Sequence, residues 1–263
     1  AHHTYGMLIR RYPDLGPNGD KRQFPAKCWH CFMPASFFRD FCLEYHRELQ
    51  QLEIDPIDDG RTQLGKNIWS HHLPGHSPDC LAVRIDAEAI LVGDIVLPDI
   101  SPWPTREAHY AEVADVLKSK YGDAGQIFGL QRYIKSLFSL ANIARTNPQL
   151  QVFPAHRLFY KGRWNGIELD ARVGELIDHH IQRCSALLDI LSEGPKTVVE
   201  LAQIHFAPEV LKGFGHLMAE NEIDSHCELL LASGDIIALG DGRYEGCGTS
   251  QFERHIASLS ASE

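Results

Sequence analysis

The sequence lacks any apolar run as long as a membrane span, and its first residues lack the charged leader and apolar stretch typical of a signal peptide. We therefore expect no membrane partner. The cysteines are odd in number and scattered, which suits reduced thiols better than a disulfide framework. Their positions are Cys28, Cys31, Cys42, Cys80, Cys184, Cys227 and Cys247. Together these features predict a cytoplasmic protein.

Basic residues are scarce in the last third of the chain. Residues 173–263 contain five Lys or Arg and fifteen Asp or Glu, a balance of −10 that equals the net charge of the whole chain. Residues 1–172 are therefore neutral overall. The uneven charge predicts two units, a first domain over residues 1–170 and a separate module over residues 171–263. An acidic module repels nucleic-acid phosphates, so DNA is not an expected partner.

The chain does contain three short segments that each place a metal-binding side chain beside Gly, Pro or Ala at the end of an apolar run. These side chains are His76 in Pro-Gly-His-Ser-Pro, Asp94 in Leu-Val-Gly-Asp-Ile and His156 in Phe-Pro-Ala-His. A ligand that leaves a rigid strand at a sharp turn can point its donor atom into a shared cleft. Imidazole and carboxylate donors suit zinc, iron or manganese. The alternative interpretation is three polar turn residues at strand ends.

The order of the predicted elements indicates a layered α/β or α+β fold. Short β-rich runs precede two amphipathic helices, and a further strand leads to His156. In chain order we expect a helix over 35–54, strands over 67–73, 81–85 and 89–96, helices over 105–121 and 129–145, and a strand over 151–153.

The acidic part begins with a long helix, predicted over 171–191, whose apolar residues form one stripe. Three more helices are expected over 198–204, 208–219 and 222–231, followed by a hairpin that turns at Gly240-Asp-Gly. This pattern is typical of a winged helix. A DNA reader needs Lys and Arg on its third helix and wing, and both are acidic here. We expect the module to pack against the first domain, to cover the cleft or to mediate dimerisation.

The segments around His76, Asp94 and His156 resemble three ligand segments of the metallo-β-lactamase superfamily. The resemblance continues through Leu176-Ile-Asp-His-His-Ile-Gln-Arg and Gly194-Pro-Lys-Thr. It is similar to the winged-helix-bearing branch, which includes glyoxalase-II-like hydrolases and an endoribonuclease-like group. It implies an αββα sandwich with two zinc ions at the sheet edges, or iron or manganese in their place. By position, His76 would bind the first metal, His156 the second, and Asp94 would bridge both as the catalytic carboxylate.

The superfamily's first motif, His-x-His-x-Asp-His, is present only in part. His3 fits its last histidine and His2 stands where the family has aspartate, while the earlier histidines would precede residue 1. The resemblance thus implies His2 and His3 as further metal ligands, unless both belong to a cloning tag. The first layer of strands would also lie upstream, since half a sandwich exposes an apolar sheet face and an unpaired edge. An N-terminal segment or a companion polypeptide is therefore an expected partner.

Three functions stay open from the sequence. The first is hydrolysis of a small ester, thioester or lactone by metal-activated water, which suits the ligand set and the neutral first 172 residues. The second is an endoribonuclease or another phosphodiesterase. That activity needs a basic track to the cleft, and only Lys21, Arg22 and Lys27 form a compact basic group. The third is a non-catalytic binding protein with a degraded metal site.

Other histidines and aromatics have simpler interpretations. His71 and His72 alternate on a strand, so one of them should face the core. His179 and His180 are expected where the long helix meets the first domain. The aromatic residues between 160 and 164 are expected in a surface loop.

Overall fold

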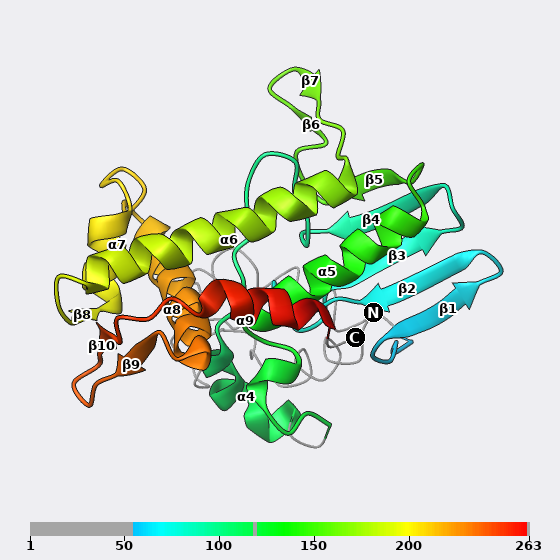
Figure 1. Ribbon diagram of the computed structural model, residues 1–263. Helices are drawn as coiled ribbons and strands as arrows, with labels where there is room; N and C mark the ends of the chain where they lie inside the picture. Colours follow the sequence, from blue (N-terminus) through cyan, green and yellow to red (C-terminus); the bar gives the residue numbers. More distant parts are fainter. Residues whose placement is uncertain (1–54, 118–119, 262–263) are drawn as a thin grey trace, which may run out of the picture.

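The computed structural model describes residues 55–117 and 120–261 (Figure 1). The predicted helix over 35–54 and the candidate ligands His2 and His3 lie outside these ranges. No helix within the described ranges is both long enough and apolar enough to cross a membrane.

A five-stranded mixed sheet forms the centre of the region before α6, which the sequence predicted as the first domain. Its strands lie side by side in chain order, antiparallel from β1 to β4 and parallel between β4 and β5 (Figure 1). The parallel pair brings the carboxyl ends of β4 and β5 to the same edge of the sheet. The bounds are β1 Arg61–Gly65, β2 Ile68–His72, β3 Leu81–Ile85, β4 Ala89–Gly93 and β5 Gln151–Pro154.

The structure confirms strands in the four regions where the sequence predicts them, but β1 was not predicted. The segment Arg61–Gly65 has a single large apolar residue, Leu64, and lacks the alternation that marks a strand. It lies at the edge of the sheet and pairs with β2. Edge strands commonly carry charged and polar residues, so pairing with a neighbour and not the sequence pattern defines this strand.

Two helices cover one face of the sheet. α5 (Leu130–Thr146) and α6 (Leu169–Leu191) lie next to each other (Figure 1). Their buried apolar stripes share one core with side chains of β3, β4 and β5, namely Ala82, Ile90, Val92 and Val152. Each Å² of apolar surface removed from water stabilises the fold by about 25 cal/mol, so this core fixes the sheet against the helices.

The opposite face of the sheet leaves large apolar side chains exposed. Leu91 and Phe153 pair in register and are 43% and 38% exposed, and Ile68 and Ile85 pair at 38% and 37%. Because side chains alternate along a strand, this face lies opposite the buried Ile90. The described residues therefore supply one sheet and one helical layer of the predicted αββα sandwich.

The predicted helix over 105–121 is confirmed only in its second half. A 3₁₀ turn over Glu107–His109 runs into α4 (Tyr110–Leu117). The preceding Arg106 has extended backbone, with φ −85° and ψ 142°. Thr105 is drawn away from a helix because its N–H and its hydroxyl both donate to the carbonyl of Gly75, at 2.7 and 2.8 Å.

The C-terminal part combines helices with a small antiparallel sheet in the order β8-β10-β9. The predicted hairpin is confirmed as β9 and β10, while the winged helix as a whole stays a prediction. The elements are β8 Lys196–Thr197, α7 Val198–His205, α8 Gly215–Ser233, β9 Ile236–Ala238, β10 Arg243–Gly246 and α9 Phe252–Ser258.

The two helices predicted over 208–219 and 222–231 are wrong in their bounds. Residues 208–214 form turns, in which Gly213 has φ +59°, and one continuous helix, α8, covers both predictions. The sequence suggested a break near Asn221, a residue common in turns. Its amide donates instead to the carbonyl of Pro104 at 3.0 Å, so a long-range contact keeps it inside the helix.

Candidate metal centre

His76 lies in a turn that α5 holds closely. Gly75 has φ +128°, and a Cβ at this position would lie 2.4 Å from the backbone N and Cα of Tyr133. Only glycine fits both that dihedral and that close approach. The carbonyl of Pro74 accepts a hydrogen bond of 2.7 Å from the fully buried hydroxyl of Ser136. The first predicted ligand is therefore carried by a tightly constrained backbone.

One hydrogen bond orients the imidazole of His76. Its Nδ1 lies 2.7 Å from the carbonyl oxygen of Trp103, and because a carbonyl can only accept, Nδ1 carries the proton. The lone pair of Nε2 is then the available donor, which is the usual arrangement of a metal-binding histidine. Burial lowers the pKa of His76, while the hydrogen bond to Trp103 and the charge of Asp94 raise it. The first and second predicted ligands are thus electrostatic neighbours.

Asp94 and His156 meet where β4 and β5 end. The carbonyl of Gly93 accepts a hydrogen bond from the N–H of Ala155 at 2.8 Å, which joins the two strand ends. Oδ1 of Asp94 lies 3.3 Å from Nε2 of His156. Apart from this ion-pair contact, the buried oxygen has no hydrogen-bond partner among the described residues. An unsatisfied buried carboxylate oxygen costs free energy, which coordination of a cation would offset.

This donor set fits a metal ion but is incomplete in the described part of the chain. Two imidazoles and a carboxylate are N and O donors of the kind zinc prefers. Across residues 55–117 and 120–261, no group of three or more His, Cys, Asp or Glu side chains is arranged to hold a metal. The structure brings Asp94 and His156 together and links His76 to Asp94 through its charge. His2 and His3 lie outside the described residues.

Polar residues just after His76 stabilise its turn. Ser77 Oγ donates to Oδ1 of Asp79 at 2.6 Å and lies 3.1 Å from Sγ of Cys80. Burial raises the pKa of Asp79, against the hydrogen bond from Ser77. Burial also raises the pKa of Cys80 to about 12, so without a bound metal the thiol stays protonated at neutral pH.

Two residues that hold the His76 turn, Trp103 and Thr105, were not identified from the sequence. They lie in Ser101-Pro-Trp-Pro-Thr, and such a proline-rich stretch reads as an ordinary loop. Trp103 contributes its carbonyl and an edge-on ring contact, with its ring centroid 6.4 Å from that of His76. Thr105 is 1% exposed. The sequence feature that could have indicated their role is the pair of prolines around Trp103, because such a pair favours a rigid extended backbone.

The long helix α6 contacts this same loop through His179, as predicted. Nε2 of His179 lies 3.1 Å from the hydroxyl of Ser101. His180 is fully buried, and its Nδ1 lies 3.0 Å from Nε2 of His226 on α8. Burial lowers the pKa of both buried rings, to about 3 for His226, so they are neutral at physiological pH. His180 and His226 are therefore buried residues that join α6 to α8.

The histidines of β2 also have structural roles. His72 is 6% exposed, and its Nε2 lies 2.8 Å from the carbonyl of Pro78, so it is a buried and hydrogen-bonded histidine, on the face of the sheet away from α5 and α6. His71 is half-buried on the other face of the strand. Burial, followed by the charges of Arg84 and Arg61, lowers the pKa of His71 to about 4.

The aromatic residues between 160 and 164 lie on a surface hairpin, as predicted. It is formed by β6 (Phe159–Tyr160) and β7 (Arg163–Trp164). Trp164 is 74% exposed, and its ring centroid lies 5.1 Å from that of Phe159.

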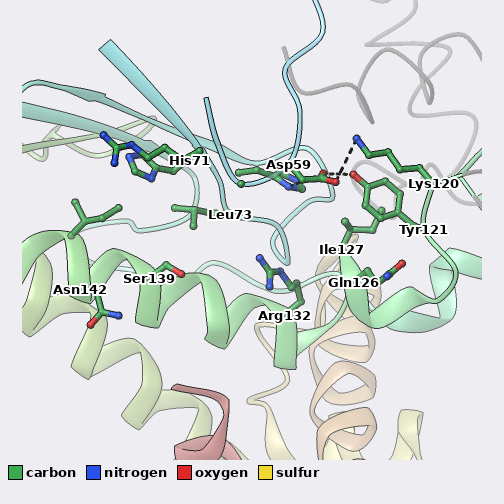
Figure 2. Close-up of a pocket in the computed structure, with 14 residues that line it drawn as sticks. Asp59, His71, Leu73, Lys120, Tyr121, Gln126, Ile127, Arg132, Ser139 and Asn142 are labelled. Carbon is green, nitrogen blue, oxygen red and sulfur yellow. Dashed lines mark hydrogen bonds and ion pairs between the residues drawn. The ribbon is translucent and has the colours of Figure 1, made fainter. Parts of the chain in front are cut away.

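A separate cavity of about 570 Å³ lies between α5 and the β1–β2 side of the sheet (Figure 2). Arg61, Lys120 and Arg132 give its wall positive charge. One carboxylate, Asp59, contacts Lys120 and the hydroxyl of Tyr121 (Figure 2). The volume is that of a small-molecule site, and the charge favours anions. None of the three candidate ligands lines this cavity.

The mixed sheet with its helical layer, and with Asp94 and His156 at adjacent strand ends, defines a layered α/β protein with ligand-type side chains at one sheet edge. That architecture is the metallo-β-lactamase fold. A metallo-beta-lactamase family protein from Thermus thermophilus superposes with a TM-score of 0.54 at 24% identity, over 78% of this chain and 59% of that chain. A beta-lactamase domain protein from Burkholderia ambifaria gives 0.57 at 22% identity, over 81% and 59%.

These similarities confirm the predicted fold class and the superfamily resemblance at the level of the fold. The chain spans about three fifths of the length of both solved structures. No protein-family model and no curated protein matches the sequence. The glyoxalase-II-like branch and the upstream first layer of strands stay predictions.

Proposed function

We propose that this protein is a metal-dependent hydrolase that acts on a small ester, thioester or lactone. The observation that carries the proposal is Oδ1 of Asp94, which is buried, has no hydrogen-bond partner among the described residues and lies 3.3 Å from Nε2 of His156. A cation would satisfy both groups. Residues 1–172 are neutral overall, so they offer no net positive charge to attract a nucleic acid.

In this proposal Asp94 would be the catalytic carboxylate and would help to hold both metal ions. His76, through Nε2, and His156 would be the other ligands, with His2 and His3 as further candidates. Zinc suits these donors, and iron or manganese suits them too. When bound, the metal supplies a water of lowered pKa and polarises the substrate's carbonyl oxygen.

The chain's own residues prepare the site in two ways. The carbonyl of Trp103 holds the proton of His76 on Nδ1, which keeps Nε2 unprotonated and fixes the ring direction. The side chains of His156 and Asp94 are 67% and 38% exposed, so a small molecule can reach this edge of the sheet. One ligand is thus held rigidly, and the other two lie at an open edge.

We further propose that another layer of polypeptide covers the exposed sheet face, either an N-terminal segment or a companion chain. The four exposed apolar side chains, Ile68, Ile85, Leu91 and Phe153, support this, since contiguous exposed apolar surface marks an interaction site. A second copy of the chain, forming a homodimer, is the other candidate occupant. The scattered cysteines support a cytoplasmic location.

A phosphodiesterase is the second candidate function. The observation in its favour is the cavity lined by Arg61, Lys120 and Arg132, which offers positive charge that the sequence alone did not reveal. Against it, the cavity does not include the candidate metal ligands, and the C-terminal part is acidic. A binding protein with a degraded metal site is the third candidate.

Elemental analysis of the purified chain and of two variants tests the metal centre. We expect the wild type to retain zinc, or iron or manganese, and Asp94→Ala to lose both the metal and hydrolase activity. Asp99→Ala is a matched control, because Asp99 pairs with Arg157 at 3.0 Å and not with a candidate ligand. Metal retention by Asp94→Ala would show that the proposed bridging role is wrong, and a metal-free wild type would favour the binding protein.

The same preparations distinguish the substrates. We expect turnover of a glutathione or acyl-CoA thioester and no cleavage of single-stranded RNA. RNA cleavage that disappears in Asp94→Ala would instead establish the phosphodiesterase.

A further inference from the structure

Three side chains of α8 reach out of the C-terminal part and hold one short segment of the first domain. Asn221 Nδ2 donates to the carbonyl of Pro104 at 3.0 Å. Asp224 Oδ2 accepts from the guanidinium of Arg106 at 2.6 Å. The carboxylate of Glu228 accepts from two backbone N–H groups, those of Glu107 at 2.8 Å and Ala108 at 3.0 Å. We name residues 103–108 the bridging segment.

The other end of the bridging segment holds the turn of the first predicted ligand. Thr105 donates twice to the carbonyl of Gly75, and the carbonyl of Trp103 accepts from Nδ1 of His76 at 2.7 Å. The residue held by Asn221, Pro104, stands directly between Trp103 and Thr105. A displacement at Pro104 therefore moves the carbonyl that orients His76.

Three contacts between α8 and the bridging segment are at least partly shielded from water, while the bond from Ala108 to Glu228 lies at an exposed residue. Asn221 is 3% exposed and Thr105 is 1% exposed. The Arg106–Asp224 pair has side chains that are 18% and 15% exposed, and Asp224 also accepts from the hydroxyl of Tyr244 at 3.2 Å. Hydrogen bonds that are shielded in this way are costly to leave unmade, so the segment has few alternative positions.

We propose that Asn221 and Glu228 of α8 are positioning residues for the metal ligand His76, acting through the bridging segment. The inference rests on the proposed metal site and gives the C-terminal part a role in it. α8 includes residues 222–231, the third helix of the predicted winged helix, and in this proposal it sets the direction of the His76 ring and does not read DNA.

The test compares Asn221→Ala and Glu228→Ala with the control Met218→Ala, whose side chain is also on α8 but is 40% exposed. Zinc affinity of the full chain is measured by competition with a chromogenic chelator. We expect both test variants to bind zinc at least about tenfold more weakly, the size of effect typical when an orienting partner of a ligand is lost. Met218→Ala should bind as the wild type does.

Repeating the zinc titration in a His76→Ala variant distinguishes a positioning role from a general loss of protein stability. If Asn221 acts through His76, Asn221→Ala should cause no further loss of zinc affinity when His76→Ala is already present. An equal loss in both backgrounds would overturn the proposal, and so would unchanged affinity in variants whose thermal unfolding shows that the contacts are lost. Asn221→Asp keeps an oxygen but not the donating amide, so it should not restore the affinity.

Nitrogen NMR of metal-free protein shows which nitrogen of the His76 ring carries the proton. This measurement tests the positioning role independently of the proposed function, because it needs no bound metal. We expect the wild-type ring to hold its proton on Nδ1 and the two test variants to show a mixture of tautomers. A wild type that binds no zinc but has the fixed Nδ1–H tautomer, lost in Asn221→Ala, would sink the proposed function and leave the positioning role intact. A fixed tautomer in every variant would sink the positioning role.

Discussion

The two parts of the candidate site are built in opposite ways. Three contacts restrain the turn of His76. Gly75 packs against the backbone of α5, the carbonyl of Pro74 accepts a hydrogen bond from Ser136, and the carbonyl of Trp103 accepts one from the His76 ring. Asp94 and His156 instead stand at an open edge, with a carboxylate oxygen that has no hydrogen-bond partner among the described residues. The comparison indicates that the fold fixes His76 in advance and leaves Asp94 and His156 less restrained, which suits the proposal that a cation completes the site.

Gly75→Ala should disrupt the restrained turn of His76 and cause the largest loss in the free energy of unfolding. The new Cβ would lie 2.4 Å from the backbone of Tyr133, so α5 or the turn must shift. We expect the free energy of unfolding to fall by more than about 3 kcal/mol, as measured by urea denaturation. Gly60→Ala is the control, with φ +75° and no atom within 4 Å of its Cβ, and should cost only about 1 kcal/mol. Equal losses would mean that the turn tolerates displacement.

The protonation of Glu228, which holds the bridging segment, should make the free energy of unfolding depend on pH. We expect this effect to be smaller than that of Gly75→Ala. Burial raises the pKa of Glu228 to about 7 from 4.5, so between these values the folded state keeps a proton that the unfolded state releases. Its contribution to stability is therefore greatest below pH 4.5 and is lost as pH rises to 7. Relative to Glu228→Gln, we expect the wild type to lose about 1 to 3 kcal/mol in free energy of unfolding between pH 4.5 and 8. Parallel denaturation curves across this range would contradict the raised pKa.

His156→Ala should have the smallest effect on folding. The ring is 67% exposed and its described contact is the carboxylate of Asp94, so the metal-free free energy of unfolding should change by less than about 0.5 kcal/mol. Zinc affinity should nevertheless fall sharply. Differential scanning calorimetry with and without zinc checks both expectations, and a large loss of stability in the metal-free protein would show that the edge is not open.

The sequence predicted those parts of the site and fold that depend on local patterns. His76, Asp94 and His156 were identified because each follows an apolar run at a turn, and α6 because its apolar stripe is continuous. The structure places Asp94 and His156 in contact, as expected of neighbouring strand ends. Their roles as metal ligands stay predictions.

The parts that were missed depend on contacts between distant residues. The segment of β1 is a strand because it pairs with β2. The helix α8 continues through Asn221, whose side-chain amide donates to the carbonyl of Pro104. Trp103 serves through its backbone carbonyl, which no side-chain pattern reveals. Local propensity is a weak guide wherever such tertiary hydrogen bonds decide the outcome.

The parallel pairing of β4 with β5 has a consequence for how this scaffold can vary. The spacing between Asp94 and His156 is set by the strand ladder and by the bond from Ala155 to Gly93, and not by the long crossover that joins the strands. That crossover contains Trp103, whose carbonyl orients His76, and Asp99, which pairs with Arg157 next to His156. Substitutions next to Trp103 would therefore change the direction of the His76 ring, while the strand pairing would keep the distance between Asp94 and His156 constant.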